Sequence, residues 1–194
     1  MIAVILTGGS SRRMGQPKAW LDIGGRSCIM RVRDACVDAG FAVEFQGDLP
    51  GVQEAFPANT LHPDPEAGQG PLAALATALS RNSGLPVFLV ACDMPFLSGA
   101  LLRGVAAALQ GVDWAAPTAG GRMHPLCAAF GPAVLGPAQA LLATGRRDMQ
   151  AVLTHPELCG RSVPPESAWG DPDLLLMNVN TPDELAVARR LAGA

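Results

Sequence analysis

Residues 2–18 read Ile2-Ala3-Val4-Ile5-Leu6-Thr7-Gly8-Gly9-Ser10-Ser11-Arg12-Arg13-Met14-Gly15-Gln16-Pro17-Lys18. The first five are apolar and include β-branched residues, which is typical of a buried parallel strand. A glycine- and serine-rich loop at the carboxyl end of such a strand is where an open α/β sheet binds its ligand. Because Gly8 and Gly9 lack a Cβ, their backbone N–H groups can approach an anion closely. Together with the cations Arg12, Arg13 and Lys18, the loop predicts a site for a polyphosphate such as a nucleoside triphosphate.

The spacing of this loop excludes two common phosphate-binding patterns. Lys18 is followed by Ala19, so the pattern G-x-x-x-x-G-K-[ST] is absent. The glycines do not fit G-x-G-x-x-G either. A strand-to-helix turn that carries surface arginines is the alternative interpretation of the same residues.

Composition predicts a small soluble enzyme. The 194 residues are 49% hydrophobic, which favours one domain, residues 1–194, with a sizeable core. No apolar run is long enough for a membrane span, and no signal peptide is recognised at the amino terminus. The net charge of -3 argues against general nucleic-acid binding, whereas a local basic cluster fits a discrete anion site.

Five cysteines and three histidines carry little functional signal. The cysteine count is odd and no C-x-x-C pair occurs, so we expect free, mostly buried thiols in a reducing cytoplasm rather than metal ligands or nucleophiles. The histidines are too dispersed to predict a zinc site.

Strands and helices alternate along the chain. Apolar runs predict strands at 2–6, 41–46, 59–62, 86–91, 112–117, 125–130 and 174–176. Periodicity and capping signals predict helices at 28–39, 72–81, 99–109, 133–143, 148–153 and 182–191. Thr181, Pro182 and Glu184 form a capping-box pattern at the last of these, and 163–172 is the best candidate for a mobile loop. This order predicts a three-layer α/β/α, Rossmann-like fold with a mostly parallel central sheet.

Three carboxylates lie at or just after predicted strand ends. Asp93 follows the strand at 86–91, and Pro95 prevents the chain from continuing directly into a helix. A carboxylate facing a phosphate repels it unless Mg²⁺ bridges the two, so Asp93 is a candidate metal ligand, with a helix cap or turn as the alternative. Asp64 lies between two prolines, and its residue pattern fits either a contact with nucleotide or metal or a structural role in the turn. A surface turn is favoured for Asp48.

Five blocks follow one another along the chain: Leu6 to Lys18, Gly70-Pro71-Leu72-Ala73, Cys92-Asp93-Met94-Pro95-Phe96, His124-Pro125-Leu126-Cys127 and Asn178-Val179-Asn180-Thr181-Pro182. In this order they resemble the molybdenum cofactor guanylyltransferases, the family of molybdopterin-guanine dinucleotide biosynthesis protein A. The first block alone is shared by nucleotidyltransferases of the glycosyltransferase-A-like superfamily, and the other four make the resemblance specific.

The resemblance implies an enzyme that joins the GMP moiety of GTP to the terminal phosphate of molybdenum-bearing molybdopterin and releases pyrophosphate. It implies Mg²⁺ as cofactor, held by Asp93, and Lys18 as the group that neutralises phosphate charge, with Arg12 or Arg13 binding phosphate. The implied nucleotide-binding residues are Leu6, Thr7, Gly8, Gly9, Ser10, Lys18, Asp48, Asp64 and Asp93.

The second substrate, molybdopterin, is expected near Arg146, Arg147, Asn178 and Asn180, which match family positions on the pterin side. The alternatives are a solvated helix start for the two arginines and a helix cap for the second asparagine. The resemblance also implies molybdenum-insertion proteins and molybdoenzyme apo-proteins as partners.

Two departures from the family pattern keep a second nucleotide open. Thr7 stands where many relatives have alanine, and Pro17 stands where many have an acid just before the lysine. The resulting Gln16-Pro17-Lys18 is also common among the related cytidylyltransferases. Those cytidylyltransferases tend to carry Ala-Gly in place of Gly8-Gly9, and the extra methyl would crowd a purine. The sequence therefore favours GTP over CTP. Two further functions stay open: a nucleotide-binding scaffold without turnover, which delivers the cofactor, and a sugar-phosphate nucleotidyltransferase.

Overall fold

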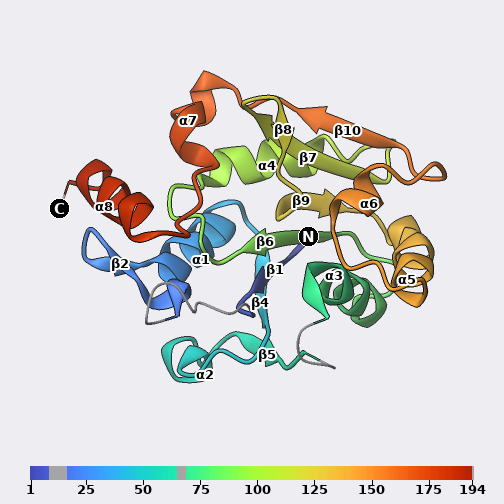
Figure 1. Cartoon of the computed structure of the whole chain (residues 1–194), viewed down its shortest axis with the longest axis horizontal. Helices are drawn as coiled ribbons and strands as arrows, with labels where there is room; N and C mark the ends of the chain where they lie inside the picture. Colours follow the sequence, from blue (N-terminus) through green and yellow to red (C-terminus); the bar gives the residue numbers. More distant parts are fainter. Residues whose placement is uncertain (9–16, 65–68, 194) are drawn as a thin grey trace.

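The computed structural model describes residues 1–8, 17–64 and 69–193. Its described strands form one large sheet in the order β10-β7-β9-β6-β1-β4-β5, with β8 paired to β7 (Figure 1). Their bounds are β1 (Ile2–Leu6), β4 (Ala42–Gln46), β5 (Thr60–His62), β6 (Val87–Ala91), β7 (Trp114–Ala119), β8 (Arg122–Met123), β9 (Cys127–Phe130) and β10 (Gly160–Val163). The sheet is mostly parallel, and β9 runs antiparallel to both of its neighbours.

The register brings three strand ends to one edge. Leu6, the last residue of β1, lies opposite Gln46 of β4 on one side and Ala91 of β6 on the other. Because these strands are parallel, the loops that follow them leave the sheet side by side.

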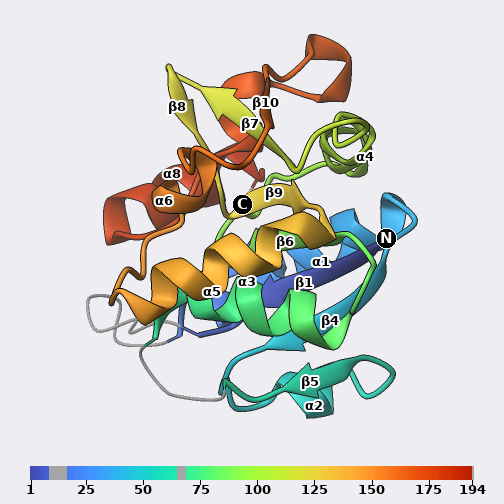
Figure 2. The same cartoon turned by 90° about the vertical axis from the view of Figure 1, so that its right-hand side faces the viewer.

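Helices cover both faces of the sheet (Figures 1 and 2). The apolar core is divided by β1, whose Ala3 and Ile5 belong to one cluster and whose Val4 and Leu6 belong to the other. The alternation of side chains along a strand explains how one continuous apolar run serves two cores. The first cluster includes α1 (Cys28–Asp38) and α4 (Gly99–Ala107), and the second includes α3 (Gly70–Arg81), α5 (Leu135–Ala143) and α6 (Gln150–Leu153).

A third apolar cluster joins residues 21–28 to the C-terminal residues 179–188. The hairpin β2 (Asp22–Ile23) and β3 (Arg26–Ser27) packs against α8 (Pro182–Leu191), and both lie on the same side of the molecule in Figure 1. Leu21 and Ile23 are buried here with Val179, Leu185 and Ala188. The short elements that remain are α2 (Val52–Ala55), α7 (Pro172–Leu175), and the 3₁₀ turns η1 (Lys18–Trp20), η2 (Pro132–Val134) and η3 (Ser167–Trp169).

The strand expected at 174–176 is wrong, because these residues lie in and after helix α7. Asp171 caps α7 by accepting the N–H of Asp173 at 3.0 Å, and Pro172 occupies its first turn. These helix-start signals outweigh the strand tendency of the three consecutive leucines at 174–176. The strands β8 and β10 and the β2–β3 hairpin were not predicted, because they are short and are held by pairing rather than by an apolar pattern.

The predicted capping box at α8 is confirmed, with both of its hydrogen bonds present. Ser27 precedes α1 as expected, but its side chain makes no capping hydrogen bond. Within the part of the chain that the structure describes, no helix has the length and apolar character to cross a membrane.

Candidate active site

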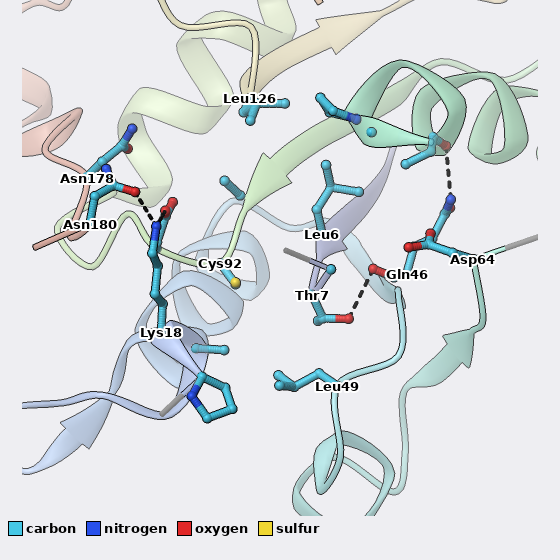
Figure 3. Close-up of a pocket in the computed structure, with 18 residues that line it drawn as sticks. Leu6, Thr7, Lys18, Gln46, Leu49, Asp64, Cys92, Leu126, Asn178 and Asn180 are labelled. Atoms are coloured by element: carbon cyan, nitrogen blue, oxygen red, sulfur yellow. Dashed lines mark hydrogen bonds and ion pairs between the residues drawn. The ribbon is translucent and has the colours of Figure 1, made fainter. Parts of the chain in front are cut away.

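A cavity of about 450 Å³ opens at the carboxyl ends of β1, β4 and β6 (Figure 3). It collects residues from the loops after these strands, from the start of α3 and from the segment before α8. Its described lining consists of Leu6, Thr7, Gly8, Pro17, Lys18, Ala19, Gln46, Leu49, Asp64, Gly70, Pro71, Ala74, Ala91, Cys92, Asp93, Leu126, Asn178 and Asn180. All five predicted blocks, separated widely in the sequence, contribute residues to this one cavity.

Lys18 projects from η1 toward the segment before α8 (Figure 3). Its Nζ donates to Oδ1 of Asn180 and lies 3.7 Å from Oδ2 of Asp93. The side chains of Lys18 and Asp93 are 25% and 18% exposed, so this ion pair is only partly screened by water. Lys18 is also the only lysine among the 14 lysine and arginine residues of the chain. A primary ammonium is thus held at the cavity wall.

Asp93 comes shortly after the buried strand β6, as predicted. Burial raises the pKa of its carboxyl above the usual 3.8, whereas the nearby Lys18 ammonium lowers it. The backbone carbonyl of Asp93 accepts the N–H of Val179 at 2.9 Å, which ties the end of β6 to the segment before α8. Asp93 is therefore a partly desolvated carboxylate with a fixed backbone, next to a cation.

The opposite wall contains Gln46 and Asp64 (Figure 3). Gln46 is 1% exposed at the end of β4, and its Nε2 donates to the carbonyl of Ala74 in α3 at 3.2 Å. Its Oε1 is buried without a hydrogen-bond partner among the described residues. Burial raises the pKa of the Asp64 carboxyl, against the lowering effect of the Gln46 amide. A buried amide oxygen with no partner is costly, so a ligand donor at this point would stabilise it.

The floor between the two walls depends on close backbone packing. A Cβ on Gly47, whose φ is +127°, would lie 2.6 Å from the backbone nitrogen of Gly8 and 2.8 Å from Oγ1 of Thr7. A Cβ on Gly8 would lie 3.0 Å from Oδ2 of Asp64. The Thr7 hydroxyl donates to the carbonyl of Gln46 at 3.0 Å. The hydroxyl that Thr7 adds, relative to the alanine of many relatives, therefore has its hydrogen-bond partner inside the protein.

The remaining predicted site residues lie in different places. Asp48 is exposed and is not part of the described cavity lining. Arg146 is exposed and pairs with Asp148 at 2.9 Å, and Arg147 donates to the carbonyl of Leu142 at 3.0 Å. Gly9, Ser10, Arg12 and Arg13 lie outside the described residues.

Arg147 nevertheless lies close to the cavity. A Cβ on Gly70, which lines it, would lie 3.3 Å from the backbone oxygen of Arg147 and 3.6 Å from its Cβ. Of the predicted pterin residues, Asn178 and Asn180 therefore line the cavity, Arg147 lies at its margin, and Arg146 is exposed.

Gln46 and Leu126 line the cavity, although neither was predicted as a site residue. The sequence does contain a signal for Gln46, because this polar residue is the last residue of a predicted strand whose carboxyl end lies at the ligand-binding edge of the sheet. Leu126 belongs to a recognised block, but nothing in its own chemistry distinguishes it from core.

The cysteines fit the expectation of free thiols, and Cys159 is exposed whereas most of the rest are buried. All five are free. Cys92 lines the cavity, but burial raises the pKa of its thiol to about 12, so it is protonated and a poor nucleophile at neutral pH. The described residues contain no cluster of three or more metal-binding side chains.

Comparisons with known proteins agree with this geometry. Residues 3–159 match the family described as the MobA-like NTP transferase domain. The chain is 34% identical over 193 residues to the probable molybdenum cofactor guanylyltransferase of Pelotomaculum thermopropionicum, covering 97% of this chain and 92% of that protein. It is 33% identical over 196 residues to the molybdenum cofactor guanylyltransferase of Rhizobium meliloti, covering 96% and 89%.

Solved structures share the fold. Molybdopterin-guanine dinucleotide biosynthesis protein A from Archaeoglobus fulgidus superposes with a TM-score of 0.82 at 24% identity, covering 100% of this chain and 99% of that one. The 2-C-methyl-D-erythritol 4-phosphate cytidylyltransferase from Thermus thermophilus gives 0.70 at 20% identity, with coverage of 100% and 99%. The same architecture therefore occurs in proteins named for different nucleotides.

Proposed function

The chain belongs to the MobA-like NTP transferase family and is a nucleotidyltransferase, and from this premise we propose that it transfers GMP from GTP to the terminal phosphate of molybdenum-bearing molybdopterin. Pyrophosphate is the second product. The names of its relatives support this reaction, and the partner proteins that receive the product are expected to be molybdoenzymes and molybdenum-insertion proteins.

One observation carries the proposal: a single cavity unites Lys18 and Asp93 with Asn178 and Asn180 on one wall and Gln46 and Asp64 on the other. A cation and carboxylates at the ends of parallel strands suit a nucleoside triphosphate. Amide groups on both walls offer neutral donors and acceptors to a base on one side and to a pterin on the other.

The chemistry proposed requires positioning more than proton transfer. The attacking group is a phosphate oxygen that is already an anion, so no strong general base is needed. The two substrates are polyanions, and negative charge develops on the α-phosphoryl group as the bond to pyrophosphate breaks. Lys18 Nζ is suited to neutralise this charge, and one such interaction is worth about 3 kcal/mol of transition-state stabilisation.

We propose Asp93 as the ligand of Mg²⁺. Mg²⁺ is commonly held by one or two carboxylates together with phosphate oxygens and water, so the donor set needs no larger cluster of protein ligands. Asp93 supplies a hard carboxylate oxygen at the cavity wall, and Asp64 supplies a second carboxylate across it. When bound, the ion would neutralise phosphate charge and orient the triphosphate.

Gln46 is suited to contact the base. Its buried Oε1 can accept an N–H from a nucleobase edge, and guanine offers two such donor groups on one edge. Cytosine offers an exocyclic amine as well, so this contact alone does not select the nucleotide. We base the preference for GTP on the relatives' names and on the absence of a side chain at Gly8.

Calorimetric titration with GTP, CTP, ATP and UTP, with and without Mg²⁺, tests the nucleotide. Selective Mg²⁺-dependent GTP binding is the expected result. A preference for CTP would overturn the guanylyl assignment, and binding followed by no pyrophosphate release with molybdopterin would favour a scaffold without turnover. The free thiols are consistent with action in a reducing cytoplasm, which fractionation of cells would check.

A further inference from the structure

The first turn of α8 is connected to Lys18 by a continuous set of hydrogen bonds. Oε2 of Glu184 accepts the backbone N–H of Asn180 at 2.6 Å and that of Thr181 at 2.9 Å. Oγ1 of Thr181 accepts the N–H of Glu184 at 3.2 Å. Asn180, whose backbone is held in this way, accepts from Lys18 Nζ with its side-chain oxygen. A helix cap thereby reaches an ammonium group in the candidate active site.

Glu184 makes one more contact than a capping box requires. The capping box needs only the bond to Thr181, the N-cap residue. The second bond, to Asn180, fixes the peptide that precedes the cap. On the far side of this peptide, the N–H of Val179 donates to the carbonyl of Asp93 at 2.9 Å. The three residues 179–181 are thus held to both α8 and the end of β6.

We propose that Glu184 is a positioning residue for the transfer reaction, because it holds the Asn180 backbone so that Asn180 Oδ1 and Asp93 together keep Lys18 Nζ at the cavity wall. A lysine side chain has a flexible four-carbon stem and loses substantial freedom when fixed. Two acceptors from different segments restrict it more than either alone. The catalytic consequence rests on the proposed function, whereas the restraint on Lys18 does not.

Two substitutions separate the hydrogen bonds of Glu184 from its charge. Glu184→Gln keeps a side-chain oxygen that can accept both backbone N–H groups and removes the negative charge. Glu184→Ala removes the acceptor and the charge together. If hydrogen bonding to Asn180 is what positions Lys18, the glutamine variant behaves like the parent protein and the alanine variant does not.

The sole lysine makes the position of Lys18 directly measurable. Lys18 and the α-amino group of the chain are the only amines that a small amine-reactive acylating reagent, used at one fixed pH without nucleotide, can modify. Mass spectrometry of peptides then gives the Lys18 rate relative to the α-amino rate as an internal reference. We expect Glu184→Ala to raise this ratio about threefold or more, as for the loss of a charge-assisted hydrogen bond, and Glu184→Gln to leave it within about twofold.

Steady-state kinetics supply the second readout. We expect Glu184→Ala to lower kcat about tenfold with little change in KM for the nucleotide, since Lys18 acts on charge that develops in the transition state. Glu184→Gln should restore most of kcat. A uniform rise in KM with kcat unchanged would contradict the positioning role.

Ser98→Ala is the matched control, because it also removes a helix N-cap. The Ser98 side chain caps α4 by accepting the N–H of Leu101 at 3.2 Å. The substitution also removes the hydrogen bond that the Ser98 hydroxyl donates to the carbonyl of Trp169 at 2.6 Å, and neither contact involves the candidate site. An unchanged labelling ratio in Glu184→Ala, or an equal rise in Ser98→Ala, would overturn the proposal. A changed ratio in Glu184→Ala alone, in a protein whose parent transfers no nucleotide, would uphold the restraint and refute the proposed function instead.

Discussion

The two walls of the cavity differ in how their polar groups are satisfied. On the wall of Lys18, charged groups already have partners: the ammonium contacts Asn180 and Asp93. On the wall of Gln46, a buried amide oxygen has no partner among the described residues, and burial raises the pKa of the neighbouring Asp64 carboxyl. The first wall is organised without a ligand, as electrostatic catalysis requires, and we expect a ligand to complete the second.

The largest expected effect is on the charged wall. Asp93→Asn removes the carboxylate that we propose for Mg²⁺ and is expected to lower turnover by at least about 100-fold. Because the substitution replaces a partly buried charge by a neutral group of the same shape, the fold should be retained. Pyrophosphate release and circular dichroism measure the two quantities.

Asp183→Asn, an identical change at an exposed position of α8, is its control. Activity that survives in Asp93→Asn would show that the metal assignment is wrong. An equal loss in both variants would show that net charge rather than position is responsible.

The second-largest expected effect concerns the wall that contains Gln46. Gln46→Leu removes both the unpartnered oxygen and the donor to Ala74, and is expected to weaken nucleotide binding about tenfold. Binding should fall more than kcat, because the base is contacted equally in the ground state and the transition state. Calorimetry combined with initial rates tests this, and unaltered affinity would mean that the ligand does not approach Gln46.

The third effect sharpens the nucleotide preference. Gly8→Ala is expected to weaken GTP binding more than CTP binding, because a methyl group here crowds a purine. The structure adds a second consequence, since the new Cβ would lie 3.0 Å from Oδ2 of Asp64 and displace that carboxylate. Competition binding with both nucleotides distinguishes the two effects: equal losses for GTP and CTP would assign the whole effect to Asp64.

The smallest effect lies behind the second wall, where β5 ends. Burial and the Arg81 cation lower the pKa of His62 below 6.5, although Glu44 opposes this. The unfolded chain therefore binds the proton at a higher pH than the folded chain, so this contribution to stability is complete above about pH 6.5 and is lost as the pH falls. Urea unfolding at about pH 7.5 and about pH 5.5 should show a smaller difference for His62→Gln than for the parent. An unchanged difference would exclude His62 as a cause.

Local signals predicted much of this molecule. The apolar run of β1 and the capping box of Thr181 and Glu184 each specify an element through neighbours in sequence, and both elements are confirmed. Asp93 was recognised as a candidate because it follows a predicted strand at the ligand edge of the sheet, and the structure places it in the cavity lining, whereas its role stays a prediction. The contact between Lys18 and Asn180 spans 162 positions and depends on how α8 packs on the β2–β3 hairpin. The residue pattern within either segment does not predict this packing. Gln46 was missed although it ends a predicted strand, because its position in the sequence does not show that its side-chain oxygen lacks a partner in the fold.

The contact between Lys18 and Asn180 also has a consequence for the order in which the chain folds during its synthesis. Lys18 leaves the ribosome early, but its partner lies 162 positions later in the chain. The strand β1 can pair with β4 and β6 long before α8 exists, so a nascent chain can build most of its sheet while Lys18 still lacks its contact with Asn180. The complete set of contacts around Lys18 is therefore expected to form only once α8 has emerged and packed.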